Sequence, residues 1–543
     1  MRKYIFVVGG VMSGVGKGVA TASIGKILQA RGFEVTAIKI DPYVNVDAGT
    51  MNPTEHGEVF VLDDGTECDQ DMGNYERFFG KNFSGVNYMT TGSIYQAVIT
   101  RERNLEYKGK CVEVVPQIPL EVISRINKAA TKEEAEIIVI EIGGTAGEYQ
   151  NILFLEAIRM LKIKKPKDVL LVLVSFVPAL GGGGTELKTK PTQYAVRTLN
   201  STGLQPDIII ARASVPLDSR RKKTISLNCN IEEGDIISAP NVENIYEVPV
   251  NFEKDDLGAR LLNKLSIKAK QRDLRKWKRL VVVIRSAKKP VTIGIVGKYF
   301  GSGSFILTDS YISVLEAVKH ASYALKHKPI IEWIDSEDFE KSPAKLQTLS
   351  AYNGIIVPGG FGSRGVEGKI SAIRYCREKK IPYLGLCYGM QLAVVEFARH
   401  VAGLRKAHTT EINPKTPYAV IDILPEQKKL VLEKHYGGTM RLGAYPAMLK
   451  NSSIARQAYK QNLISERHRH RYEVNPKYIE RLEKKGLLFS GFSPDRRLME
   501  IMELPRDKHP FFVGTQFHPE FKSRPLNPHP LFTEFIKAAV KNK

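Results

Sequence analysis

The sequence predicts two α/β domains, the first of them a P-loop-like doubly wound parallel sheet. Short apolar runs typical of buried strands alternate with helical stretches through the first half of the chain. The first run ends in a glycine-rich loop with a lysine, and a later run, residues 381–386, ends in a second tight glycine turn. With 543 residues the chain is long enough for more than one domain. The expected strands of the first half cover residues 4–8, 34–40, 137–140, 168–176 and 207–211.

The loop at residues 9–18 has the layout of a phosphate-binding loop. An apolar strand precedes it, and a helix is expected over residues 19–31, so backbone N–H groups at the helix N-terminus can surround a phosphate. Lys17 is placed to reach the outer phosphates of a nucleotide. The usual metal-binding Ser or Thr after this lysine is replaced by Gly18. A metal site must therefore use other side chains.

Two carboxylates are candidates for that metal site. Glu141 follows the apolar run 137–140, and Asp71 lies in a polar stretch. The carboxyl ends of parallel strands are where open α/β sheets bind ligands. Because Mg²⁺ is typically held by one or two carboxylates together with phosphate oxygens and water, Asp71 and Glu141 are candidate Mg²⁺ ligands beside a bound phosphate.

The second tight turn carries a candidate nucleophile. Cys387 stands between Gly385 and Gly389, directly after an apolar run, which is the form of a nucleophile elbow at a helix N-terminus. The helix dipole at that position favours a thiolate. His518 and Glu520 provide a base and a carboxylate to orient it. The alternative is a small core cysteine and an unrelated loop histidine.

Composition and charge narrow the class of protein. Apolar residues make up 43% and charged residues 25%, as in ordinary globular proteins. No apolar run approaches 18 residues and no signal-peptide layout is present, and the few scattered cysteines suit a reducing compartment, so a cytoplasmic protein without membrane association is expected. The net charge of +22 is spread along the chain without aromatic interleaving, which argues against nucleic acid as a partner. It fits polyanionic nucleotides, and a hot habitat is an open alternative.

The C-terminal half resembles the class I glutamine amidotransferases. The resemblance runs from about Val291 to the end and rests on the Cys387 elbow, the pair His518 and Glu520, and the string Pro-Gly-Gly-Phe-Gly at residues 358–362. It implies a class I glutamine amidotransferase α/β domain in which these three residues form a triad that releases ammonia from L-glutamine. Residues implied to bind glutamine or its oxyanion are Gly359, Gly360, Tyr388, Gly389, Met390, Gln391, Glu411 and Arg471.

Over nearly its full length the chain is similar to the CTP synthase family. Long strings carry this similarity, at residues 39–47, 49–61, 187–193 and 467–472. The resemblance implies a ligase in which ATP phosphorylates UTP at the 4-oxygen and ammonia then displaces the phosphate to give CTP. It also implies GTP as an allosteric activator, product CTP as an inhibitor, ammonia passing inside the protein, and a homo-oligomer, from dimer to tetramer.

The same resemblance assigns residues to each ligand. ATP would be held by Gly14, Val15, Gly16, Lys17, Gly18, Val19, Asp71, Pro240, Asn241 and Val242. UTP or CTP would be held by Ser13, Glu148, Tyr149, Gln150, Lys188, Thr189, Lys190, Pro191, Thr192, Gln193, Lys223 and Thr224. The ammonia gate would include Pro53, His56 and Val59, and the GTP lid Arg364 and Arg441.

The expected domains are an amidoligase domain at residues 1–267, an exposed linker at 268–290 and an amidotransferase domain at 291–543. The chain departs from the family pattern at Gln150, Thr224 and Pro240–Asn241, which leaves the strength of CTP feedback and the adenine preference open. Two alternatives remain. One is another glutamine-dependent amidoligase, and the other is a catalytically dead nucleotide sensor.

Overall fold

A computed structural model describes residues 2–180, 186–297, 301–302, 305–306, 308–360, 362–423 and 440–542. The chain forms two compact units. The first consists of Met1–Ala48 and Asp71–Val281, and the second of Gly49–Gln70 and Val282–Lys543. The segment 49–70 thus leaves the first unit and belongs by its contacts to the second. The two units are therefore not simple successive segments of the sequence.

The first unit is built on a seven-stranded sheet in which all neighbouring strands are parallel. Every residue of β1, β2 and β6 is buried, as expected where helices cover both faces. In spatial order the strands are β11 (Ile236–Pro240), β10 (Ile208–Ala213), β7 (Val169–Phe176), β1 (Lys3–Gly10), β6 (Ile137–Ile142), β2 (Val35–Asp41) and β5 (Tyr88–Thr90). The doubly wound parallel sheet predicted from the sequence is confirmed.

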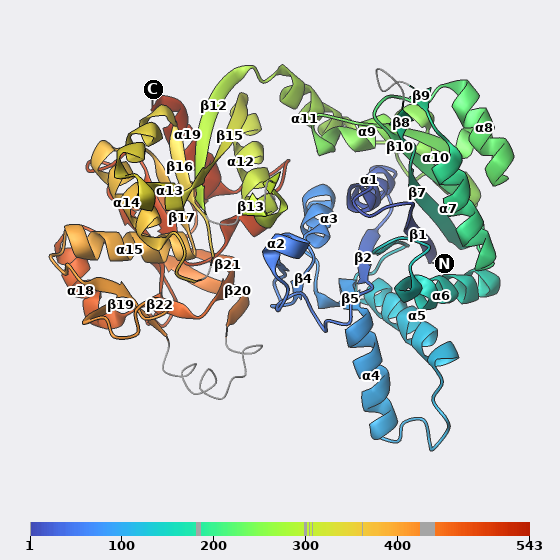
Figure 1. Cartoon of the computed structure of the whole chain (residues 1–543), viewed down its shortest axis with the longest axis horizontal. Helices are drawn as coiled ribbons and strands as arrows, with labels where there is room; N and C mark the ends of the chain where they lie inside the picture. Colours follow the sequence, from blue (N-terminus) through green and yellow to red (C-terminus); the bar gives the residue numbers. More distant parts are fainter. Residues whose placement is uncertain are drawn as a thin grey trace. The chain divides into compact units, whose positions relative to one another are not determined.

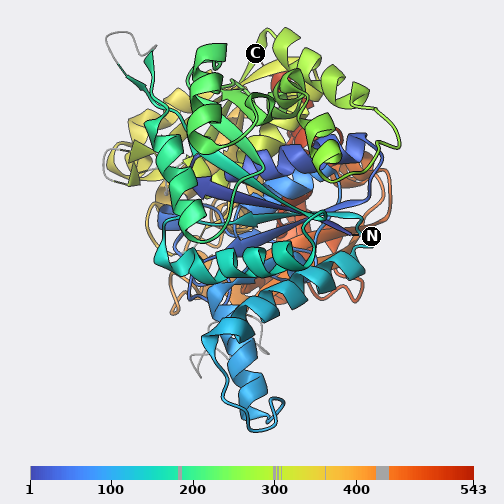
Figure 2. The same cartoon turned by 90° about the vertical axis from the view of Figure 1, so that its right-hand side faces the viewer.

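Helices lie on both faces of this sheet (Figures 1 and 2). One face packs against α5 (Val114–Lys132), α6 (Ile152–Lys164) and α7 (Lys190–Ser201), and α1 (Lys17–Ala30) and α3 (Asp71–Phe79) lie on the other. Beyond the β5 edge, α4 (Thr91–Arg103) and α5 project as a helical hairpin. The remaining elements of the unit are α8 (Ser219–Cys229), α9 (Val248–Phe252), α10 (Leu257–Lys264), β8 (Ala179–Leu180) and β9 (Glu186–Leu187).

Residues 275–286, expected as part of an exposed linker, instead form α11 (Arg275–Ser286). Its apolar side chains recur at helical spacing, and Trp277, Val281 and Ile284 are buried. The Trp277 indole donates a hydrogen bond to the carbonyl of Tyr246 at 2.8 Å. The basic residues of this segment lie on the exposed face of the helix, and its apolar residues lie on the buried face.

The second unit has a nine-stranded mixed sheet whose first five strands are parallel and whose last four run antiparallel to their neighbours. The strands in order are β15 (His327–Asp335), β12 (Lys289–Gly297), β16 (Gly354–Val357), β17 (Tyr383–Leu386), β25 (Phe512–Thr515), β24 (Met499–Leu504), β23 (Leu488–Phe492), β20 (Arg441–Leu449) and β21 (Leu463–His470). The expected strand at 381–386 is confirmed as β17.

Two apolar cores cover the faces of this sheet. One includes side chains of α12 (Ile312–Ala324) and α19 (Pro530–Lys541), and the other those of α14 (Val366–Lys379) and α15 (Tyr388–His400). The smaller elements are α2 (Pro53–His56), β3 (Phe60–Val61), β4 (Glu67–Cys68), β13 (Gly301–Ser302), β14 (Phe305–Ile306), α13 (Ser336–Lys341), β18 (Ala407–Thr409), β19 (Tyr418–Ile423), α17 (Ile454–Tyr459), β22 (Tyr472–Val474) and α18 (Pro476–Lys484). Within the described ranges, no helix combines the length and apolarity needed to cross a bilayer.

Candidate active sites

Cys387 lies at the sharp turn from β17 into α15 in the second unit. Its φ of 51° is rare for a residue with a side chain and indicates a strained backbone, as in a nucleophile elbow. Gly389 permits the turn, because a Cβ there would overlap the carbonyl of Val357. Cys387 as a whole residue is only 4% exposed. The predicted elbow is therefore present, with the thiol at the N-terminus of α15.

His518 and Glu520 stand beside Cys387. The Nδ1–H of His518 donates to Oε1 of Glu520 at 2.7 Å, while Nε2 has no hydrogen-bond partner among the described residues. Gly359 approaches the same site, because a Cβ on it would lie 3.0 Å from Cε1 of His518. The structure thus brings together the three residues expected to form a triad and the expected oxyanion loop.

Charge favours the imidazolium form of His518. Burial opposes that charge, but the carboxylate of Glu520 and the Cys387 sulfur outweigh burial and raise the pKa of His518 to about 10. A protonated histidine next to a thiol stabilises the thiolate. The structure therefore places the charged form of His518 beside the Cys387 thiol.

These side chains line a cavity of about 280 Å³ within the second unit. Of the residues expected to bind glutamine, Gly359, Gly360 and Arg471 line it. Glu411 instead accepts a hydrogen bond from the Gly362 N–H at 3.0 Å, and Gln391 is 2% exposed and bonded to other protein groups. Gly389, Met390, Gln391 and Glu411 do not line the cavity, although Tyr388 begins the helix beside it.

Segment 49–70 contributes one wall of this cavity. Gly49, Met51, Glu58 and Val59 line it, so one of the three expected gate residues is at the cavity. Glu58 accepts hydrogen bonds from the N–H and hydroxyl of Ser313 at the start of α12. His56 ends α2, and the side chain of Pro53 lies outside what the structure describes.

In the first unit, the phosphate loop has the geometry that the sequence predicts. Lys17 begins α1 and donates a hydrogen bond to the carbonyl of Gly144 at 2.6 Å. A Cβ on Gly18 would overlap the carboxylate of Asp71. The absent Ser or Thr after Lys17 thus has a physical reason, since the Asp71 carboxylate occupies the space that such a side chain would need.

A cluster of carboxylates surrounds Lys39 beside this loop. Its ammonium lies 2.5 Å from Asp71, 3.1 Å from Glu141 and 3.6 Å from Asp41. Burial raises the pKa of Glu141, and the Tyr75 hydroxyl donates a hydrogen bond to it. Among the described residues no group of three or more His, Cys, Asp or Glu forms a ready metal site. The carboxylates of Asp71 and Glu141 suit Mg²⁺ that arrives with the phosphates of a nucleotide, and the ion would then take the place of the Lys39 ammonium.

A second cavity, of about 300 Å³, opens next to the phosphate loop. Gly16 and Val19 of the loop and helix line it together with Pro240, Asn241 and Val242, as expected for one ATP site. Arg212 also lines it, and its guanidinium donates to the carbonyls of Ala239 and Pro240 at 3.1 Å each. Sequence reasoning missed Arg212, whose position depends on β10 pairing with β11.

The residues expected to hold UTP or CTP are on loops and helix ends of the same unit. Lys188 pairs with Glu186 at 2.5 Å on an exposed surface, and Lys190 and Pro191 begin α7. The hydroxyl of Thr192 bonds Ser175 at 2.9 Å, and the amide of Gln193 donates to Thr189 at 3.1 Å.

The rest of that expected set lies on other loops and on α8. Gln150 donates to Glu148 at 2.6 Å, and Tyr149 is 93% exposed. The hydroxyl of Thr224 donates to the carbonyl of Arg220 in α8 at 2.9 Å, so it turns back onto its own helix. Ser13 and Lys223 are exposed. These positions leave the pyrimidine contacts a prediction.

Known proteins resemble this chain over its whole length. The family model described as CTP synthase N-terminus matches residues 3–267, and the one described as Glutamine amidotransferase class-I matches residues 306–538. A CTP synthase of Thermococcus gammatolerans is 51% identical over 545 residues, covering 100% of this chain and 99% of its own length. A CTP synthase of Halalkalibacterium halodurans is 48% identical over 540 residues, covering 99% of each chain.

The chain belongs to the CTP synthase family. A solved glutaminase domain of Trypanosoma brucei CTPS with bound acivicin is 39% identical, covers 46% of this chain and 94% of its own, and superposes with a TM-score of 0.43. Membership makes the chain a ligase with a glutamine amidotransferase domain, as predicted.

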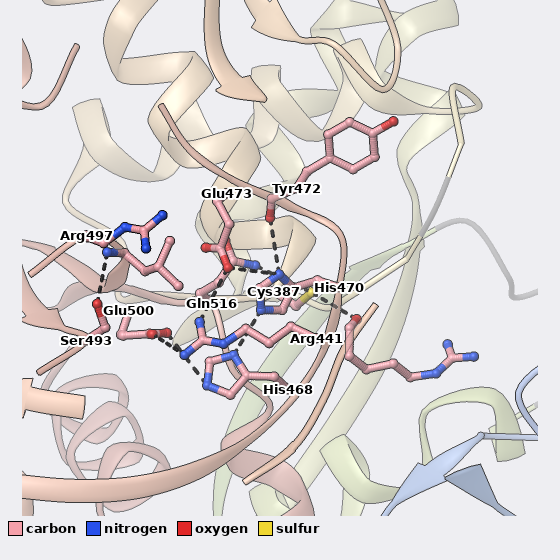
Figure 3. A network of polar contacts seen from close by, with 12 residues as sticks. Cys387, Arg441, His468, His470, Tyr472, Glu473, Ser493, Arg497, Glu500 and Gln516 are labelled. Atoms are coloured by element: carbon pink, nitrogen blue, oxygen red, sulfur yellow. Dashed lines mark hydrogen bonds and ion pairs between the residues drawn. The ribbon is translucent and has the colours of Figure 1, made fainter. Parts of the chain in front are cut away.

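In this member of the CTP synthase family, Arg441, which is expected in the GTP lid, is the first residue of β20. It is buried and lies 2.7 Å from Glu500 and 3.4 Å from Glu473 (Figure 3). Its guanidinium also lies over the ring of Tyr445. Burial holds the pKa of the neighbouring His468 and His470 well below the usual range, so both are neutral. The resemblance implies that the lid segment is residues 437–443, of which 437–439 lie outside the described residues. Arg364, the other expected lid residue, pairs with Glu337 on the surface.

Proposed function

We propose that the chain makes CTP from UTP, using ATP and ammonia that it releases from L-glutamine. The observation that carries the proposal is that one chain holds both a strained cysteine elbow with His518 and Glu520 and a phosphate loop with Lys17 beside two carboxylates. Each half of the reaction thus has candidate residues within its own compact unit.

Glutamine hydrolysis begins with attack of the Cys387 thiolate on the side-chain carbonyl carbon of glutamine. The N–H of Tyr388 and the loop at Gly359 and Gly360 stabilise the oxyanion. His518 donates its proton to the departing ammonia, and Glu520 holds the imidazolium in position through its 2.7 Å bond. Water, deprotonated by His518, then hydrolyses the thioester and restores the thiolate.

Transfer to UTP depends on positioning and charge neutralisation. Gly14 to Val19 and Lys17 bind the ATP phosphates, with Pro240 to Val242 beside the base. Asp71 and Glu141 would hold Mg²⁺, which neutralises phosphate charge when bound. The γ-phosphoryl group passes to the 4-oxygen of UTP, and ammonia attacks carbon 4 and expels phosphate. Ser13, the loop at 148–150, the segment 188–193 and residues 223–224 hold the pyrimidine nucleotide.

Regulation and assembly complete the proposal. GTP would activate glutamine hydrolysis, product CTP would compete with UTP, and Val59, His56 and Pro53 would gate ammonia. The chain would form a homo-oligomer, as the resemblance implies, and the first unit has large apolar side chains exposed that an interface could cover. They include Val44 at 83% and Tyr149 at 93% exposed, and Ile99 and Leu105 on the α4–α5 hairpin.

One assay with two variants tests the proposal. The chain is incubated with UTP, ATP, Mg²⁺ and either glutamine or ammonium, and CTP is measured. Cys387→Ala should lose synthesis from glutamine but keep synthesis from ammonium, because only the thiolate chemistry is removed. Lys17→Ala should keep basal glutamine hydrolysis and lose CTP formation by orders of magnitude. Absence of CTP from the unaltered chain in every condition would contradict the proposal.

A further inference from the structure

Gln516 lies against the candidate nucleophile and has no role in the triad. Its side-chain amide donates a hydrogen bond to Sγ of Cys387 at 3.8 Å, and the two residues lie side by side in Figure 3. Gln516 is fully buried, directly after β25 and two residues before His518. Its own N–H bonds the carbonyl of Glu500 at 2.8 Å, which fixes its backbone.

The direction of the Gln516 amide is determined by its neighbours. The Nε2 of Gln391 donates to the main-chain carbonyl of Tyr472 at 2.9 Å, and a carbonyl can only accept, so the orientation of Gln391 is fixed. The same Nε2 lies 3.4 Å from Oε1 of Gln516 and donates to it. With its oxygen turned to Gln391, Gln516 must direct its NH₂ group at the sulfur.

The sulfur has a second polar neighbour of the opposite kind. The main-chain carbonyl of Arg469 lies 3.9 Å from Sγ and can accept a hydrogen bond only from the protonated thiol. A donor favours the thiolate and an acceptor favours the thiol. Gln516 is therefore a neighbour whose hydrogen bond favours the reactive thiolate form of Cys387 over the thiol.

We propose that Gln516 is a further catalytic residue that hydrogen-bonds the Cys387 thiolate, and that Gln391 is a positioning residue that orients the Gln516 amide. Gln391 acts on the nucleophile through Gln516, because its amide holds the Gln516 oxygen while the Gln516 NH₂ group faces the sulfur. This inference rests on the proposed glutamine hydrolysis at Cys387.

The test measures the rate of alkylation of Cys387 by iodoacetamide as a function of pH, in the full-length chain, by mass spectrometry of the Cys387 peptide. Only the thiolate reacts, so the midpoint of the profile reports its formation. Besides Cys387, the titratable groups that line the cavity are Glu58, Tyr311, Arg469, Arg471, His518 and Glu520, and all of them stay unchanged in the variants.

Gln516→Met keeps the length and shape of the side chain but removes the donor. Its midpoint should rise by about one pH unit, with alkylation about tenfold slower below the midpoint. Gln391→Met should shift the midpoint in the same direction by less, because it frees the Gln516 amide to turn. Gln347→Met, an exposed glutamine of the same unit, is the matched control and should not move it.

A merely structural role for Gln516 would lower the thermal midpoint and leave the pH midpoint in place, which would overturn the inference. If Gln516→Met does not fold, the alkylation profile of Gln391→Met is the test. An unchanged pH midpoint in that variant would likewise overturn the inference. Glutamine hydrolysis by the unaltered chain tests the proposed function separately, because the alkylation profiles are measured without substrate.

Discussion

Oε1 of Glu67 lies 2.7 Å from Nε of Arg469, the residue whose main-chain carbonyl is 3.9 Å from the sulfur of Cys387. Two residues earlier on β21, Arg467 pairs with Asp63 at 2.5 Å and accepts the N–H of His518 on its carbonyl. The β3–β4 hairpin thus holds, through two ion pairs, the strand whose backbone touches Cys387 and His518. We interpret the hairpin as a support for the triad.

Glu67→Gln should slow glutamine-dependent CTP synthesis by roughly 5- to 30-fold, because a partly buried Arg469 loses its charge partner and β21 loses a restraint. Synthesis from ammonium should be little changed, since the first unit is intact. Glu480→Gln, which breaks an exposed pair with Lys484 in the same unit, is the control. Equal loss from both nitrogen sources would show that Glu67 does not act on the glutaminase site.

Glu520→Gln tests the charge that acts on His518. Without the carboxylate, the pKa of His518 should fall from about 10, and glutamine hydrolysis at pH 7 should drop by roughly 10²-fold or more. The folded pKa lies above the unfolded value of 6.5, so His518 contributes stability below pH 6.5 that is lost as pH rises through 10.

The stability difference between the unaltered chain and Glu520→Gln should therefore shrink between pH 7 and pH 10. Urea unfolding at several pH values measures it. A difference that stays constant over this range would contradict the raised pKa of His518.

Local motifs predicted the core of both sites. The loop ending at Lys17, the elbow at Cys387 and the pair His518 and Glu520 each lie within a few residues of sequence, so their geometry follows from a single turn. The parallel strands were predicted for the same reason, since continuous apolar runs specify strands buried on both faces.

The contacts of other site residues depend on which strands pair and in which register, and a single sequence does not show this. Lys39 meets Glu141 because β2 and β6 are neighbours in that register, and Asp63 meets Arg467 across 404 positions. Gln516 lies two residues before His518 in the sequence, but the direction of its amide depends on contacts with Gln391 and Tyr472. Arg441 was assigned by resemblance to a mobile segment, whereas the order of β20, β21 and β24 places it beside two buried carboxylates.

Arg441→Ala should destabilise the second unit by about 3–5 kcal/mol at pH 8, because it leaves Glu473 and Glu500 buried without their cation. Burial already raises the pKa of both carboxyls, and removing the arginine raises it further. At pH 5 both carboxyls are then protonated in the folded variant, so the loss of stability should be smaller than at pH 8. Chemical denaturation at the two pH values measures this.

Arg374→Ala, which breaks an exposed pair with Glu378, is the control and should cost about 1 kcal/mol or less. Unchanged stability in Arg441→Ala, together with a selective loss of GTP stimulation, would instead support the lid role that the resemblance implies.

Gln150→Glu concerns how the chain distinguishes product from substrate. CTP and UTP share a triphosphate, so discrimination must come from the base, where the exocyclic amine of CTP donates a hydrogen bond. In the structure the Gln150 amide donates to Glu148 at 2.6 Å, and Glu148 also accepts the N–H of Thr145 at 2.8 Å. A glutamate at position 150 would lose this bond, and the Glu148 carboxylate would repel it. The side chain at position 150 would then turn away from Glu148 and present an ionised hydrogen-bond acceptor.

A charged acceptor binds an amine about twice as strongly as a neutral amide, so CTP inhibition should tighten by about fivefold, or about 1 kcal/mol. The KM for UTP should stay nearly unchanged, because UTP has no amine at that position. Gln271→Glu adds the same charge to an exposed site of the first unit and should leave both constants unchanged. The measurement is the CTP inhibition constant of each variant in ammonium-dependent synthesis. Unchanged or weaker CTP inhibition in Gln150→Glu would mean that residue 150 does not contact the base.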